Sequence, residues 1–191
     1  MLYDTAISAI NVISLLILDY IIRKSDVTNI KAKRFFRFSI LVTIIAIIAE
    51  ILSMYFESGP AFLRVPNIIV NMIGFSVSPL IPLLTGCAIS NRYKKGAFLF
   101  WIPSAVNFAV SLLSSKFPII FSVNLENVYS RGNFFWIYVV AYGAGMAYLF
   151  WETLAETIRY QNKNRSVLFI LFLFLVFGTS VQVAAPQLHI S

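Results

Sequence analysis

The chain has 191 residues, of which 59% are hydrophobic and 12% are charged, and its formal net charge is +7. This composition argues against a water-soluble globule of this length, because the few polar residues could not cover its surface. The basic residues lie in short segments beside apolar runs, where they would meet lipid headgroups, so nucleic acid is not an expected partner.

Six apolar runs are long enough to cross about 30 Å of hydrocarbon at about 1.5 Å per residue. They cover residues 3–22, 38–56, 65–89, 97–113, 134–151 and 167–185. We therefore predict an all-α fold, a polytopic transmembrane helical bundle of six spans that forms one domain over residues 1–191. The lipid bilayer of a bacterial cell membrane is the expected location.

The charges between the runs predict the orientation of the bundle. Twelve of the 15 Lys and Arg residues fall in the first, third and fifth gaps, and Arg64, Lys116 and Arg131 fall elsewhere. Lys and Arg concentrate in cytoplasmic loops, so these three gaps are expected inside and the N-terminus outside. The first run lacks the preceding basic stretch of a cleavable signal and is therefore interpreted as an uncleaved span.

The third run contains two prolines, Pro79 and Pro82. Proline removes a backbone donor, so a kink or a short unwound turn is expected there. The functional interpretation is a hinge between the two halves of this span, and the alternative is ordinary tolerance of proline in membrane helices. The segment 114–133, half apolar, is expected to fold back over the outer mouth of the bundle.

Strongly polar side chains recur in the middle or outer half of the predicted membrane, where they are costly. They come from the second, third, fourth and sixth runs: Glu50, Asn67, Asn71, Asn107 and Gln182. Their shared depth predicts an outward-facing pocket for a small ligand or ion, lined also by Tyr138 and Tyr142 and capped by Arg131. The alternative is a structural polar core of interhelical hydrogen bonds.

Catalytic and metal motifs are absent from the sequence. It contains no His-Glu-x-x-His helix, no Gly-x-Ser-x-Gly turn and no glycine-rich phosphate loop, and it has one Cys and one His. No enzymatic activity, cofactor or metal site is therefore expected, and Cys87 is interpreted as a packing residue.

The order of these residues resembles the multi-span sensory region that precedes GGDEF diguanylate cyclase domains in many bacterial proteins. The matching residues are Glu50, Asn67, Asn71, Gly74, Phe75, Pro79, Ile81, Pro82, Pro103, Asn107, Phe121, Asn124, Asn127, Tyr129, Arg131, Gly132, Gln182 and Pro186. The resemblance covers essentially the whole chain and implies a signal-input module, expected as a homodimer, that regulates an output domain.

The sequence departs from that family at its end. Such regions look like seven-span units whose last helix leads to the catalytic domain, whereas this sequence ends after the sixth run and holds no Gly-Gly-Asp-Glu-Phe motif. The resemblance therefore implies a fragment, a truncated reading frame or a stand-alone relic. The main alternative is a small six-span substrate-binding subunit of a transporter, and a structural partner subunit is a third hypothesis.

Overall fold

The computed structural model describes residues 2–24, 30–90 and 97–159. Its elements, in chain order, are α1 (Leu2–Lys24), α2 (Ile30–Glu57), the 3-10 helix η1 (Ala61–Leu63), α3 (Arg64–Val77), α4 (Leu80–Ile89), α5 (Phe98–Leu113), β1 (Phe121–Val123), β2 (Tyr129–Arg131) and α6 (Trp136–Arg159). Helices dominate because an apolar chain in lipid must pair its backbone polar groups internally.

Three helical stretches are long and apolar enough to cross a membrane: Thr5–Lys24, Ile30–Glu57 and Ala61–Ile89. The fourth predicted span corresponds to α5, a shorter apolar helix. Helix α6 covers the fifth predicted span but does not belong to these three, and the sixth, residues 167–185, lies outside the described residues. Six crossings and an outside N-terminus therefore stay predictions.

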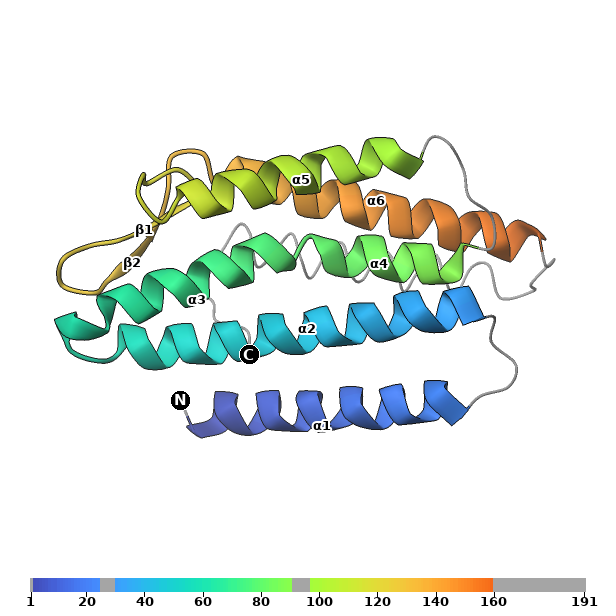
Figure 1. Cartoon of the computed structure of the whole chain (residues 1–191), viewed down its shortest axis with the longest axis horizontal. Helices are drawn as coiled ribbons and strands as arrows, with labels where there is room; N and C mark the ends of the chain where they lie inside the picture. The colour runs from blue at the N-terminus through green and yellow to red at the C-terminus, as the bar shows by residue number, and fades with distance from the viewer. Residues whose placement is uncertain (1, 25–29, 91–96, 160–191) are drawn as a thin grey trace.

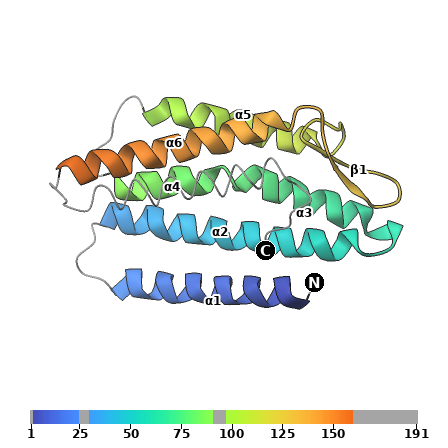
Figure 2. The same ribbon diagram turned by 180° about the vertical axis from the view of Figure 1, so that it is seen from behind.

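Helices α3 and α4 lie end to end in the middle of the bundle (Figure 1). Helix α2 packs against both of them, α5 packs against α3 and α6, and α6 packs against α4. Helix α1 packs against α2 at the edge of the bundle (Figure 2). None of the residues in the apolar window of α1 is buried by the other residues that the structure describes.

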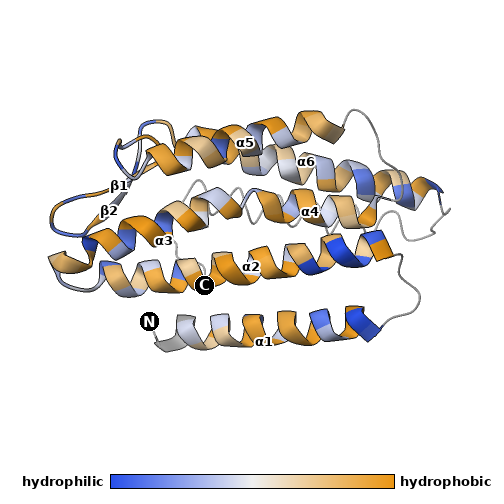
Figure 3. Ribbon diagram, viewed as in Figure 1, coloured by the Kyte–Doolittle hydropathy of each residue, from blue (hydrophilic) through white to orange (hydrophobic). Residues whose placement is uncertain are grey.

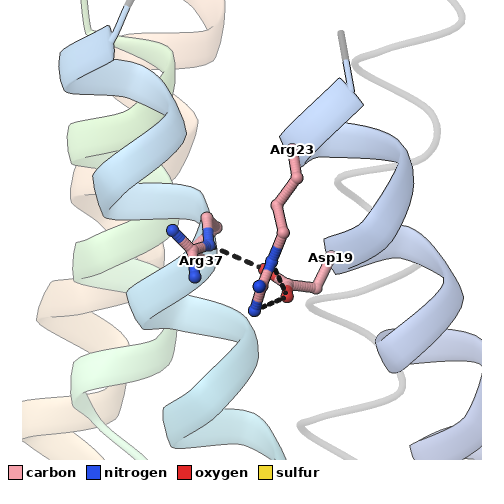
Figure 4. Close-up of polar contacts among 3 residues, drawn as sticks. All are labelled: Asp19, Arg23 and Arg37. Carbon is pink, nitrogen blue, oxygen red and sulfur yellow. Dashed lines mark hydrogen bonds and ion pairs between the residues drawn. The ribbon is translucent and has the colours of Figure 1, made fainter.

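Asp19 joins α1 to α2 (Figure 4). Its carboxylate accepts a hydrogen bond of 2.7 Å from Nε of Arg23, one turn further along α1, and one of 3.0 Å from Nε of Arg37 on α2. Hydrophilic residues gather at one end of α1, α2 and α6 (Figure 3), the end at which α1 finishes and α2 begins. We call this end the basic end. Its cations among the described residues are Arg23, Lys24, Lys31, Lys33, Arg34, Arg37 and Arg159.

The opposite end, which we call the hairpin end, carries β1 and β2. The described residues are mostly helical, as predicted, and these two strands of three residues each are an addition that the prediction did not include. The two strands pair antiparallel, with Phe121 opposite Arg131 and Val123 opposite Tyr129. Apolar and polar residues alternate in β1, so that Phe121 and Val123 are buried while Ser122 faces outward against Ser130. This period of two is a strand pattern rather than a helical one.

The prediction that residues 114–133 fold back over the bundle is confirmed. Ile120 and Phe121 are fully buried, and Val123 is nearly so. They pack against apolar side chains of α3, α5 and α6, among them Met72 and Val110. The hairpin is therefore anchored to the bundle by a small apolar core of its own.

Candidate functional site

A closed network of hydrogen bonds fastens the hairpin to α2 and α3. The Asn71 side-chain amide donates to Ser53 Oγ at 2.7 Å and to Asn67 Oδ1 at 2.8 Å. Ser53 Oγ in turn donates to Asn67 Oδ1 at 3.1 Å. Asn67 then donates from Nδ2 to Asn127 Oδ1 at 3.0 Å. Asn67, Asn71 and Asn127 are buried, so this network replaces the water that these amides would otherwise require.

Asn127 is the residue of the hairpin that reaches the bundle. Its φ of 67° lies in the left-handed region, which Asn tolerates better than most side chains. Its Nδ2 donates to the Phe56 carbonyl oxygen and, at 3.4 Å, to that of Gly59. These carbonyls lie at the C-terminal end of α2, where intrahelical donors run out. One side chain therefore bonds both to α3 and to the end of α2.

Two further bonds fix the hairpin beside that turn. Arg64 Nε at the start of α3 donates to the Val123 carbonyl oxygen at 3.0 Å, and the Tyr129 amide donates to Glu57 Oε1 at 3.1 Å. Burial raises the pKa of the Tyr129 phenol to about 12, an effect that Arg131 opposes and Glu57 reinforces. We call the set formed by Ser53, Glu57, Arg64, Asn67, Asn71 and Asn127 the hairpin latch.

Beside the latch, the ring of Phe75 on α3 is the centre of an aromatic cluster. It stacks on Phe121 at 5.5 Å between ring centroids and on Tyr129 at 6.3 Å. It also meets Phe135 at 6.0 Å and Tyr138 at 5.0 Å, both edge to face. These are favourable aromatic geometries. Both strands of the hairpin and the start of α6 thus contact one residue of α3.

The break between α3 and α4 begins one turn after Phe75. In a continuous helix the Phe75 carbonyl would accept a hydrogen bond from the amide of residue 79, but Pro79 has none. The Asn107 side chain on α5 supplies the missing donor, with Nδ2 at 2.8 Å from the Phe75 oxygen. The Ser78 carbonyl likewise lacks a helical donor, because Pro82 has no amide hydrogen. It accepts a hydrogen bond from the Ile81 amide at 3.2 Å instead. The predicted interruption of the third span is therefore confirmed.

Helix α6 packs closely against the break and against α4. A Cβ added to Gly145 would lie 2.8 Å from Pro82 Cγ and 3.1 Å from the Pro79 carbonyl oxygen. A Cβ added to Gly86 would lie 2.7 Å from the ring of Tyr148. Such short separations leave no room for a methyl group, so these glycines set the distance between α6 and α4.

The predicted pocket residues fall into separate groups in the described part of the chain. Asn67 and Asn71 belong to the hairpin latch, and Asn107 lies at the break. The rings of Tyr138 and Tyr142 are neighbours at 6.2 Å, while Arg131 lies over the Phe135 ring at 4.5 Å. Glu50 is exposed, and Gln182 lies outside the described residues. A single pocket lined by all of them stays a prediction.

The sequence reasoning missed the roles of Asn127, Phe75 and Ser53. Asn127 could have been found, because Asn in a short loop between two alternating segments is typical of a left-handed turn position. The central position of Phe75 has no comparable local signal. Among the described residues, no group of three or more His, Cys, Asp or Glu side chains could hold a metal ion.

Comparison of the chain with protein-family models, with curated proteins and with solved structures finds no match.

Proposed function

We propose that this chain is a membrane-embedded signal-input module in which the hairpin end receives an extracytoplasmic small ligand or ion. The observation that carries the proposal is the hydrogen bond between Asn67 and Asn127, because it joins an extramembrane hairpin to a helix that is interrupted further along. In this proposal a ligand competes for the amides of the latch. It then favours a second arrangement of the bundle to the extent that it binds that arrangement more tightly.

The path from hairpin to helix break runs through packed side chains. Phe121 and Tyr129 of the hairpin stack on Phe75, whose carbonyl is bonded by Asn107 at the break. Helix α6 contacts that break through Gly145. A displacement of the hairpin would therefore act on the α3–α4 break and on α6, which ends at the basic end. The expected output is a cytoplasmic domain of the diguanylate cyclase type that this sequence does not contain.

Distances between spin labels at the basic end test this proposal. The labels are placed at Lys33→Cys on α2 and Ile158→Cys on α6, in a Cys87→Ser background. Asn127→Gly keeps the left-handed backbone accessible and removes the latch amide, so the distance between the labels should shift. Asn124→Gly is the matched control, because the Asn124 side chain bonds within the hairpin, to the Val128 amide.

An unchanged distance in Asn127→Gly, with the hairpin demonstrably released, would contradict signal input and favour a structural partner subunit. Orientation is tested separately by a topology reporter fused to the N-terminus. A cytoplasmic N-terminus would contradict the proposed topology.

A substrate-binding transport subunit is the second candidate. It is favoured by the interrupted α3–α4 pair, since transporters bind substrates at discontinuous membrane helices. Uptake of a labelled substrate by reconstituted vesicles, abolished by Asn107→Leu, would support this candidate instead.

A further inference from the structure

The basic end carries a groove that the proposed function does not use. It is lined by residues of α2, α4 and α5 and has a volume of about 760 Å³, within the range of about 300–1,000 Å³ that is typical of ligand pockets. Its lining includes Lys31, Arg34, Phe35, Phe38, Leu84 and Trp101. The groove lies at the opposite end of the bundle from the hairpin latch.

The groove changes in character along the direction of α2. Lys31 and Arg34 lie in its first turns, are exposed, and are three residues apart on one face. Phe38 follows Lys31 by seven residues, which is about 10 Å along the helix. Leu84 and Trp101 add apolar walls from α4 and α5. The cations therefore lie at the end of the apolar span and the aromatic residues lie deeper.

We propose that this groove binds an anionic phospholipid, with the headgroup phosphate at Lys31 and Arg34 and an acyl chain along Phe38, Leu84 and Trp101. Two cations and no acidic side chain line the groove among the described residues, so a negative headgroup is favoured over a zwitterionic one. A soluble phosphate compound would leave the apolar walls without a partner. Basic grooves between membrane helices bind acidic lipids by this combination of charge and apolar contact.

Quenching of Trp101 fluorescence by brominated lipids tests the proposal. Trp136→Phe and Trp151→Phe remove the other two tryptophans, both more than half exposed. The purified full chain is placed in phosphatidylcholine nanodiscs that contain increasing fractions of brominated phosphatidylglycerol or brominated phosphatidylcholine. We expect phosphatidylglycerol to reach half-quenching at a fraction at least fivefold lower, which corresponds to about 1 kcal/mol in total at about 1.4 kcal/mol for each tenfold change.

The double variant Lys31→Gln, Arg34→Gln should remove that preference, while Lys33→Gln, on the same helix but outside the lining of the groove, should keep it. High salt should weaken the preference in the wild type without any mutation. Equal quenching by the two lipids in the wild type would overturn the proposal. Loss of the preference on adding glycerol phosphate at low millimolar concentration would overturn it too, because the site would then bind a soluble phosphate.

Discussion

Asn107 donates a hydrogen bond of 2.8 Å to the Phe75 carbonyl oxygen, the oxygen that Pro79 leaves without its helical donor. A side chain on α5 therefore completes the backbone hydrogen bonding of the broken α3–α4 pair. Neighbouring helices commonly make prolines tolerable in membrane helices in this way. Because Phe75 also stacks on Phe121 and Tyr129, this residue links the hairpin to the break.

Removing the Asn107 amide should destabilise the bundle only while Pro79 is present. Asn107→Leu leaves the part-buried Phe75 carbonyl without this donor, which costs about 1–3 kcal/mol. In a Pro79→Ala background a backbone amide can replace the donor, so the cost of Asn107→Leu should fall by at least about 1 kcal/mol. A double-mutant cycle of unfolding free energies in detergent measures this coupling.

Ser111→Ala is the control for that cycle. Ser111 is on the same face of α5, and its buried hydroxyl has no hydrogen-bond partner among the described residues. Its removal should change stability by less than about 0.5 kcal/mol. Additive effects of Asn107→Leu and Pro79→Ala would show that the amide does not replace the missing donor.

Gly145 should not accept even a methyl group. Gly145→Ala places a Cβ against Pro82 and the Pro79 carbonyl oxygen, so we expect a loss of about 1–3 kcal/mol through overpacking. Gly143, two residues earlier on α6, has nothing within 4 Å of such a Cβ. Gly143→Ala should therefore leave stability unchanged or raise it by up to about 1 kcal/mol. Thermal unfolding of both variants measures this difference. Equal losses of stability in the two variants would contradict the packing of Gly145 against the break.

Docking of the hairpin should weaken at high pH through Tyr129. The folded-state pKa of its phenol is raised to about 12 from an ordinary value of 10. The stability that burial of the protonated Tyr129 phenol contributes is therefore fully present below about pH 10 and is lost as the pH rises toward about 12. Tyr129→Phe should flatten the pH dependence of the unfolding free energy between about pH 9 and about pH 11.5. Exposed Tyr55→Phe is the control, and identical pH profiles for wild type and Tyr129→Phe would contradict the assignment.

Arg37 should hold α1 against α2, whereas Arg23 should not. Both bond Asp19, but Arg37 comes from α2 and Arg23 from α1 itself. Arg37→Gln should broaden the distance distribution between spin labels at exposed Ile10→Cys and Tyr55→Cys, in a Cys87→Ser background. Arg23→Gln should change it little. The change in unfolding free energy should be at most about 1 kcal/mol, because partly exposed ion pairs contribute little. A broader distribution in Arg23→Gln alone would reverse the assignment.

The sequence predicted the features that depend on local composition. Apolar length located α1, α2 and the α3–α4 pair, and Pro79 located the interruption between α3 and α4. Apolar residues in the segment 114–133 predicted that it folds back over the bundle. Each of these features follows from the length of an apolar run or from one residue type. No knowledge of which residues are neighbours in space is needed to predict it.

The remaining features depend on which residues meet in space. Asn107 and Phe75 are 32 positions apart, and Asn67 and Asn127 are 60 apart, so no periodicity within one helix could pair them. The strongly polar side chains are predicted to share one pocket because they share a depth in the membrane. A shared depth does not say in which direction around the bundle axis a side chain points. The predicted pocket residues that the structure describes are instead divided between the latch, the aromatic cluster and the break.

Hydrogen–deuterium exchange across residues 75–82 tests whether the hairpin latch is coupled to the break between α3 and α4. The full chain in nanodiscs is compared as wild type, Asn127→Gly and Asn124→Gly. If the latch and the break are coupled, Asn127→Gly should accelerate exchange of the Ser78 and Ile81 amides, while Asn124→Gly should leave them as in the wild type. Faster exchange in the hairpin of Asn127→Gly with no change across residues 75–82 would contradict the account.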